Sequence, residues 1–200
     1  MERWVLLRKG ADFEAIGKKY QISPRLACLI RNRDVIGEEA VDRYLNGTIS
    51  DLYDGMLMKD MDKAIDILKE KILEDKKIRV IGDYDIDGVN ATYILLEGLE
   101  RLGADVDSDI PDRISDGYGL NRHLVERAYE AGVDTLITCD NGIAAADEIA
   151  YGKEMGMTVI VTDHHEVPFD EQDGEKRYRI PPADAVMDPK QPDCLYPFKG

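Results

Sequence analysis

Short hydrophobic clusters at helical spacing characterise the first part of the chain. One helix is predicted to begin at Ser23-Pro24, because serine caps a helix and proline is tolerated in its first turn. A second short helix is predicted over residues 38–45. The apolar residues of 60–73 recur every three or four positions, which predicts a longer amphipathic helix.

From residue 78 onward, short hydrophobic strands alternate with helices. The predicted strands span residues 78–81, 104–110, 135–139, 158–162 and 185–187, and the predicted helices span 88–102, 121–131 and 144–155. Each of these helices ends at a glycine, namely Gly103, Gly132 or Gly156, and a strand follows within a few residues. This rhythm is typical of β-α-β units. We therefore predict an α/β fold with a Rossmann-like, mostly parallel sheet flanked by helices.

The changes of pattern divide the chain into three parts. We predict an N-terminal helical segment over residues 1–57, a connecting helix over 58–78 and an α/β domain over 79–200. The last predicted strand, 185–187, has no helix after it to cover it. We therefore expect the α/β domain to be incomplete at its C-terminus and the chain to be the N-terminal part of a longer protein.

The amino-acid composition limits the partners and the location that we expect for this protein. With 41 acidic and 26 basic residues the formal net charge is −15, so most of the surface repels polyphosphate unless cations or another region supply positive charge. No apolar run approaches the ~20 residues that cross a bilayer, so no membrane contact is expected. The cysteines, Cys28, Cys139 and Cys194, are odd in number and far apart. They indicate free thiols and a cytoplasmic location.

Acidic residues and histidines follow three of the predicted strands. Asp83, Asp85 and Asp87 follow the first, Asp140 follows the third, and Asp163, His164 and His165 follow the fourth. The carboxyl ends of parallel strands share one edge, so these groups should meet there. Crowded carboxylates repel one another unless cations lie between them, and oxygen ligands with imidazole suit Mn²⁺ or Mg²⁺. The number of ligands favours two ions, an arrangement that serves phosphoryl transfer.

The segment 111–120 follows the second predicted strand at the same edge. Its Arg113 either clamps a phosphate group or pairs with a neighbouring aspartate in an ordinary surface loop. Cys139 lies just inside a buried strand with no activating base near it in sequence, so we interpret it as a core residue and not a nucleophile.

These residues resemble the motifs of the DHH phosphoesterase superfamily, named for the Asp-His-His run that stands here at 163–165. Segment 82–88 is similar to the first motif, although Ile86 stands where the family more often has alanine, and 139–143 is similar to the second. Segment 110–121 resembles a stretch of the RecJ-type single-strand-specific DNA exonucleases that smaller DHH enzymes lack. Segments 22–64 and 188–192 are also similar to that group, so the resemblance covers nearly the whole chain.

The resemblance implies roles for individual residues. It implies Asp85, Asp87, Asp140 and His164 as metal ligands, Asp83, Asp163 and His165 as catalytic or supporting groups, and Arg113, Tyr118 and Asn141 as substrate contacts. The implied activity is 5′ to 3′ digestion of single-stranded DNA in repair and recombination, with two Mn²⁺ or Mg²⁺ ions. A further aspartate ligand and the C-terminal DNA-binding domains should then lie beyond residue 200, and the fragment alone should be weakly active or inactive.

Two other functions fit the same motifs. One is a phosphodiesterase for cyclic dinucleotides or very short RNA. The presence of the Tyr118 segment and of the N-terminal helices argues against this function. The other is a non-catalytic DHH scaffold, which is expected to lose metal carboxylates that are all present here. Pyrophosphatases share the fold but need a histidine where this chain has Ile81.

Overall fold

The computed structural model describes residues 5, 9–114, 116–172 and 174–199, and the chain divides into two compact units, Met1–Leu52 and Tyr53–Gly200. The first unit contains α1 (Phe13–Tyr20), α2 (Pro24–Asn32), α3 (Glu38–Asn46) and the short η1 (Ile49–Asp51). The helix predicted at Ser23-Pro24 is confirmed: the Ser23 hydroxyl accepts a hydrogen bond from the Leu26 amide at 3.2 Å. Helix α1 is an addition to the sequence-based prediction.

A five-stranded parallel sheet organises the second unit, with the strand order β2-β1-β3-β4-β7. Its strands are β1 (Ile78–Ile81), β2 (Val106–Asp109), β3 (Thr135–Cys139), β4 (Thr158–Thr162) and β7 (Ala185–Met187). The predicted α/β class with a mostly parallel sheet is confirmed. The chain runs outward from β1 to β2 and then crosses back to β3, so the strand order reverses between β1 and β3. Ligands bind at such a reversal in open α/β sheets, beyond the carboxyl ends of the strands.

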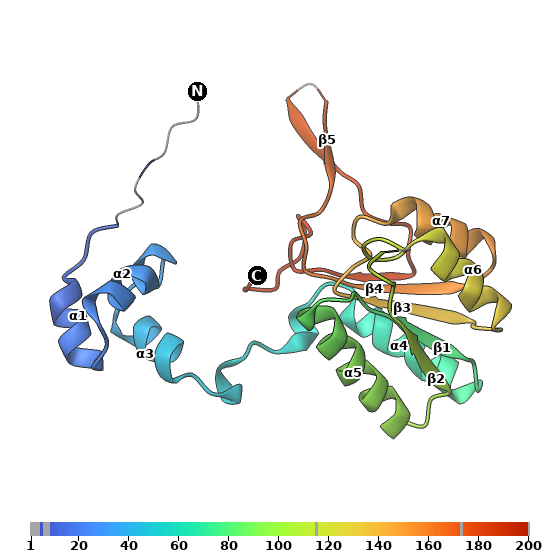
Figure 1. Cartoon of the computed structure of the whole chain (residues 1–200), viewed down its shortest axis with the longest axis horizontal. Helices are drawn as coiled ribbons and strands as arrows, with labels where there is room; N and C mark the ends of the chain where they lie inside the picture. The colour runs from blue at the N-terminus through green and yellow to red at the C-terminus, as the bar shows by residue number, and fades with distance from the viewer. Residues whose placement is uncertain (1–4, 6–8, 115, 173, 200) are drawn as a thin grey trace. The chain divides into compact units, whose positions relative to one another are not determined.

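Helices cover both faces of this sheet (Figure 1). They are η2 (Gly55–Leu57), α4 (Met61–Leu73), α5 (Ile86–Arg101), α6 (Arg122–Glu130) and α7 (Ala146–Glu154). Helices α4 and α5 pack on one face, where Val80, Ile137 and Ile160 are buried. Helices α6 and α7 pack on the other, where Leu136 and Val159 are buried. Alternate residues of the inner strands thus enter opposite core layers, which fixes their register. The helix predicted as a connector is α4, which belongs to this unit.

A two-stranded hairpin follows β4 and projects from the sheet (Figure 1). It consists of β5 (Phe169–Gln172) and β6 (Glu175–Tyr178), which pair antiparallel, and every residue of both strands is exposed. The hairpin is absent from the sequence-based prediction because it buries no regular apolar face. Among the helices of the described residues, none has the length and apolar character needed to cross a bilayer.

The first turn of α5 packs directly against the backbone of Asp83 through Gly88. A Cβ atom at Gly88 would lie 2.5 Å from the Asp83 carbonyl oxygen and 2.6 Å from its nitrogen. Backbone atoms in this packed region have little room to move, so a side chain at position 88 would displace either α5 or Asp83.

We therefore expect Gly88→Ala to lower the free energy of unfolding by about 1–3 kcal/mol. Gly98 is a matched control in the same helix, because a Cβ atom there meets nothing within 4 Å. Gly98→Ala should raise the free energy of unfolding by about 0.5–1 kcal/mol. Urea unfolding of the purified variants measures both values, and a Gly88→Ala protein as stable as Gly98→Ala would contradict this packing.

Candidate metal centre

The residues at the carboxyl ends of β1, β3 and β4 lie together at one edge of the sheet. Strand β1 leads to Asp83 and Asp85, β3 leads to Asp140, and β4 leads to Asp163. The first and third strands in the chain are neighbours in the sheet, so Asp83 and Asp140 follow the two strands between which the order reverses. The predicted convergence of these groups is therefore a direct consequence of the strand order.

Asp83 is a fully buried acidic residue of this edge. Its exposed fraction is 0%, and neither carboxylate oxygen has a hydrogen-bond partner among the described residues. A buried carboxylate without a partner is strongly unfavourable in a protein, because its lost hydration is not replaced. A bound cation would compensate this charge.

Asp140 presents a second oxygen of the same kind. Its Oδ1 lies 2.8 Å from His164 Nε2, whereas its buried Oδ2 has no partner among the described residues. Burial raises the pKa of Asp140; the bond to His164 opposes this effect, and the nearby Asp85 adds to it. The Asp140 backbone adopts a φ of 61°, a left-handed conformation that aspartate tolerates better than most residues.

Asp85 and Asp87 occupy the start of α5. Asp85 caps the helix by accepting hydrogen bonds from the amides of Asp87 and Gly88, at 2.9 and 3.0 Å. The bond from Gly88 is the main reason why the pKa of Asp85 is lowered, so this exposed carboxylate is held in its charged form. Asp87 is exposed in the first turn and lines the same cavity as Asp140 and His164.

Asp163 fixes the neighbouring residues by hydrogen bonds. Its Oδ2 accepts from the Ile143 amide at 2.9 Å, and its Oδ1 accepts from the His164 amide at 2.7 Å and pairs with His165 Nδ1 at 2.7 Å. Both oxygens are therefore engaged within the protein. Burial disfavours a charged imidazole, but the carboxylate of Asp163 outweighs this effect and raises the pKa of His165.

The Tyr118 hydroxyl completes the outer side of the cluster. It lies 3.1 Å from His165 Nε2 and 3.4 Å from the Asp140 carbonyl oxygen. Burial, followed by the surrounding aspartates beginning with Asp83, raises the pKa of Tyr118 to about 12. The phenol therefore stays protonated and remains able to donate a hydrogen bond at neutral pH.

Asn141 and Arg113 occupy different kinds of position. The buried Asn141 amide donates to the carbonyl oxygens of Ile81 and Cys139 and accepts from the Leu120 amide. This arrangement favours a positioning role for Asn141 over the substrate contact that the sequence predicts. The exposed Arg113 guanidinium lies over the Tyr84 ring at 5.4 Å, so it borders the cluster without pairing with its carboxylates.

The donor set of this edge fits hard divalent cations. Ligand atoms of Asp140, His164 and His165 lie within 4.8 Å of one another, and among the described residues the buried Asp140 Oδ2 and both Asp83 oxygens have no hydrogen-bond partner. Oxygen donors with one or two imidazoles match Mn²⁺ and Mg²⁺ better than a structural zinc site. Cys139 supplies no thiolate, because burial raises the pKa of its thiol.

Asp188 is a buried acidic residue of the same edge for which the sequence predicts no role. It directly follows β7, and its Oδ1 accepts from the Lys190 amide at 2.7 Å. Its Oδ2 has no partner among the described residues, and burial raises its pKa to about 6. The rule that identifies the other residues, an acidic group directly after a strand, applies to Asp188 as well.

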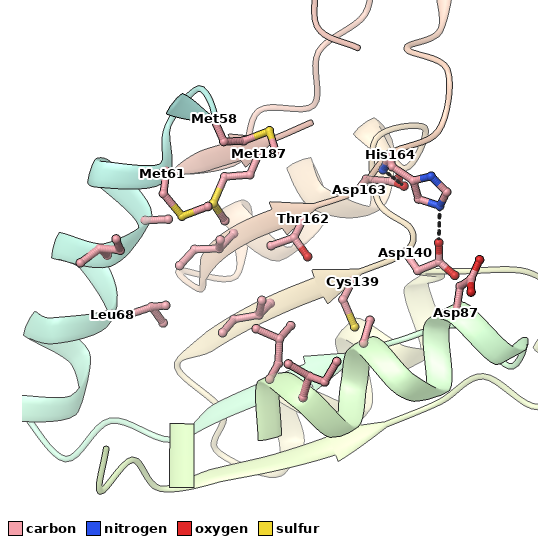
Figure 2. A pocket seen from close by; sticks show the side chains of 17 residues that line it. Met58, Met61, Leu68, Asp87, Cys139, Asp140, Thr162, Asp163, His164 and Met187 are labelled. Atoms are coloured by element: carbon pink, nitrogen blue, oxygen red, sulfur yellow. Dashed lines mark hydrogen bonds and ion pairs between the residues drawn. The ribbon is translucent and has the colours of Figure 1, made fainter. Parts of the chain in front are cut away.

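An apolar cavity of about 640 Å³ opens beside the metal centre. It lies between α4 and α5 over the sheet, with Met58, Met61 and Met187 at one end (Figure 2). Asp140 and His164 lie at the other end, where Figure 2 shows their hydrogen bond. The cavity and the metal centre are thus continuous with each other.

Comparisons with known proteins agree with this fold. The sequence model described as the DHH family, N-terminal domain, matches residues 77–195. A single-stranded-DNA-specific exonuclease RecJ from Bacillus subtilis (strain 168) is 39% identical over 198 residues, a match that covers 98% of this chain and 24% of the relative. The chain therefore spans about a quarter of the length of that relative.

Solved structures of related proteins match as well. A crystal structure of exonuclease RecJ bound to manganese matches with a TM-score of 0.61 and 36% identity, over 72% of this chain and 34% of that chain. A RecJ structure in complex with Mn²⁺ from Thermus thermophilus matches with a TM-score of 0.60 and 29% identity, over 98% of this chain and 26% of that chain. The resemblance that the motifs indicate is confirmed.

Binding of Mn²⁺ should raise the melting temperature of the protein, because an ion that binds only the folded state stabilises it by about 2.7 kcal/mol at 100 times its dissociation constant. Asp83→Asn should raise the melting temperature in EDTA, since it removes an unpaired buried charge, and should reduce the rise caused by Mn²⁺. Asp66→Asn, at an exposed position of α4, is the control. Equal Mn²⁺ effects in all three proteins would exclude Asp83 from the site.

Asp188 should make the metal-free protein less stable as pH rises. Its folded-state pKa of about 6 lies above the ordinary 3.8, so the folded state binds this proton more tightly than the unfolded state. Its destabilising effect therefore begins near pH 4, where it is small, and is complete above about pH 7, where it reaches about 1–3 kcal/mol. Asp188→Asn keeps the acceptor for the Lys190 amide and should be more stable than wild type at pH 8 but not at pH 4. A constant difference across urea titrations in EDTA would contradict this interpretation.

Proposed function

This chain belongs to the DHH family, and we propose that it provides the metal-dependent phosphodiesterase centre of an exonuclease that digests single-stranded DNA from its 5′ end. The observation that carries the proposal is the set of buried carboxylate oxygens of Asp83 and Asp140 that have no hydrogen-bond partner among the described residues, with Asp140 also bonded to His164. The similarity to single-stranded-DNA-specific exonucleases supports the choice of substrate. Roles in DNA repair and recombination belong to the same proposal.

Mn²⁺ or Mg²⁺ ions, when bound, activate a water molecule and neutralise charge on the phosphoryl group. Asp85, Asp87, Asp140 and His164 are the proposed ligands, and Asp83 is a ligand or supports one. These donors come from three strands and exceed the need of a single ion, which supports a two-ion site.

The remaining groups position the reaction. Asp163 holds the His165 ring through Nδ1, which leaves Nε2 directed to the Tyr118 hydroxyl. We propose that His165 meets the scissile phosphate and that Tyr118 donates a hydrogen bond at the same place. Because Asp163 uses both oxygens in bonds to its own chain, its proposed role is to fix the histidine pair.

The assembled cluster also bears on the competing functions. A non-catalytic scaffold has no need for buried carboxylates without partners, since each of them destabilises the fold. A phosphodiesterase of cyclic dinucleotides or very short RNA would share the centre, so substrate length is the property that separates it from an exonuclease.

The test uses the protein that contains this chain and oligonucleotides labelled at the 5′ or the 3′ end, with Mn²⁺. We expect mononucleotides to appear from the 5′ end of single strands, and Asp140→Asn to lower kcat at least about 100-fold by removing one metal ligand. Asp66→Asn is again the matched control. Hydrolysis confined to cyclic dinucleotides or to very short RNA would overturn the proposed substrate, and unchanged kcat in Asp140→Asn would overturn the proposed centre.

A further inference from the structure

Lys190 is a cation of the sheet edge for which the family motifs and the sequence provide no role. It follows β7, the last strand of the sheet, in the turn begun by Asp188. Its ammonium group lies 3.1 Å from the carboxylate of Glu166, the residue directly after His165. Lys190 therefore stands at the rim of the metal centre, on the side of β4 and β7.

The order of the strands relates Lys190 to Arg113. Strands β1, β3 and β4 occupy the middle of the sheet and carry the carboxylates and histidines, whereas β2 and β7 are its two outer strands. Arg113 lies in the loop after β2, and Lys190 lies in the turn after β7. The segments that carry these two cations therefore follow the outer strands on either side of the acidic centre, and those strands are four strand spacings apart, or roughly 19 Å at about 4.8 Å each.

The backbone around Lys190 is held in place by several hydrogen bonds. Asp188 accepts from the Lys190 amide, and Lys59 donates to the side chains of Gln191 and Asp193 at 3.1 and 2.8 Å. The Lys190 side chain is itself only 24% exposed. Much of the conformational entropy that a free lysine loses on binding is therefore already lost in the unbound protein.

The ion pair with Glu166 contributes little to the stability of the fold. The Glu166 side chain is 87% exposed, and pairs of that kind add about 0–1 kcal/mol. A phosphodiester oxygen can replace such a carboxylate at small cost, and lysine suits phosphate as a point charge.

We propose that Lys190 binds a backbone phosphate of the substrate on the β7 side of the metal centre, so that the DNA strand runs across the sheet edge between Arg113 and Lys190. This inference rests on the proposed function. Lys190 is a positioning residue in it, and Glu166 competes with the phosphate for the lysine.

The experiment measures the dissociation constant of a fluorescent 5′-phosphorylated oligonucleotide by anisotropy, in Ca²⁺ at 4 °C, with intact substrate checked on a gel. Lys190→Gln should weaken binding about fivefold or more, the effect of one lost charge-assisted hydrogen bond. It should also lower the slope of log Kd against log salt by about 0.7, the value for one phosphate contact on a single strand. Lys190→Arg should retain most of the affinity, and Glu166→Gln should tighten binding about two- to threefold.

Lys71→Gln is the matched control, because Lys71 pairs with Asp134 at 2.7 Å beside the opposite end of the strands. It changes the net charge by the same amount and should leave the salt slope unchanged. A wild-type slope and affinity in Lys190→Gln would overturn the role of Lys190 while leaving the proposed nuclease intact. Unchanged or weaker binding by Glu166→Gln, whose exposed side chain makes misfolding no explanation, would overturn the competition. Failure of the wild type to bind any oligonucleotide would overturn both proposals.

Discussion

The structure depends on one electrostatic constraint, the burial of acidic side chains that have oxygens without a hydrogen-bond partner among the described residues. Asp83 and Asp140 both have oxygens with no partner among the described residues, and Asp188, which follows the outer strand β7, repeats the pattern. Each such group opposes folding, since its hydration is lost without replacement. The fold tolerates them because two apolar layers, one on each face of the sheet, stabilise the strands that carry them. Binding of metal ions turns the same repulsion into attraction.

The surrounding backbone explains how these groups keep their geometry. Gly88 lets the first turn of α5 contact the Asp83 backbone, and Asn141 joins the ends of β1 and β3 through the carbonyl oxygens of Ile81 and Cys139. Asp163 orders the two histidines in the same manner. The polar residues for which the motifs imply a role in the reaction therefore divide into two sets. One set has free oxygens for ions, and the other is fully bonded and fixes the first.

Much of this arrangement can be predicted from the sequence, because buried strands and helices produce a regular pattern of apolar residues. The inner strands are apolar on both faces, so their ends and the acidic groups after them can be located, and parallel pairing then brings those ends together. The β5–β6 hairpin has no such apolar pattern, since all residues of its two strands are exposed. The bonding of Asn141 and the burial of Asp188 depend on which loops meet, and strand ends alone do not determine that. For Asp188 a signal does exist, namely its place directly after β7.

The order of the β-strands also bears on how an acidic chain could bind the anionic substrate proposed for it. A net charge of −15 repels a phosphate backbone over most of the surface, but repulsion at the centre is relieved wherever ions neutralise the carboxylates. The path of a DNA strand would then depend on the sign of the charge at the sheet edge on either side of the metal centre. Arg113 lies after one outer β-strand and Lys190 after the other, so under the proposal each side of the metal centre would offer one cation to a phosphate. If the proposed substrate is correct, the acidity of the remaining surface would disfavour other paths for a DNA strand.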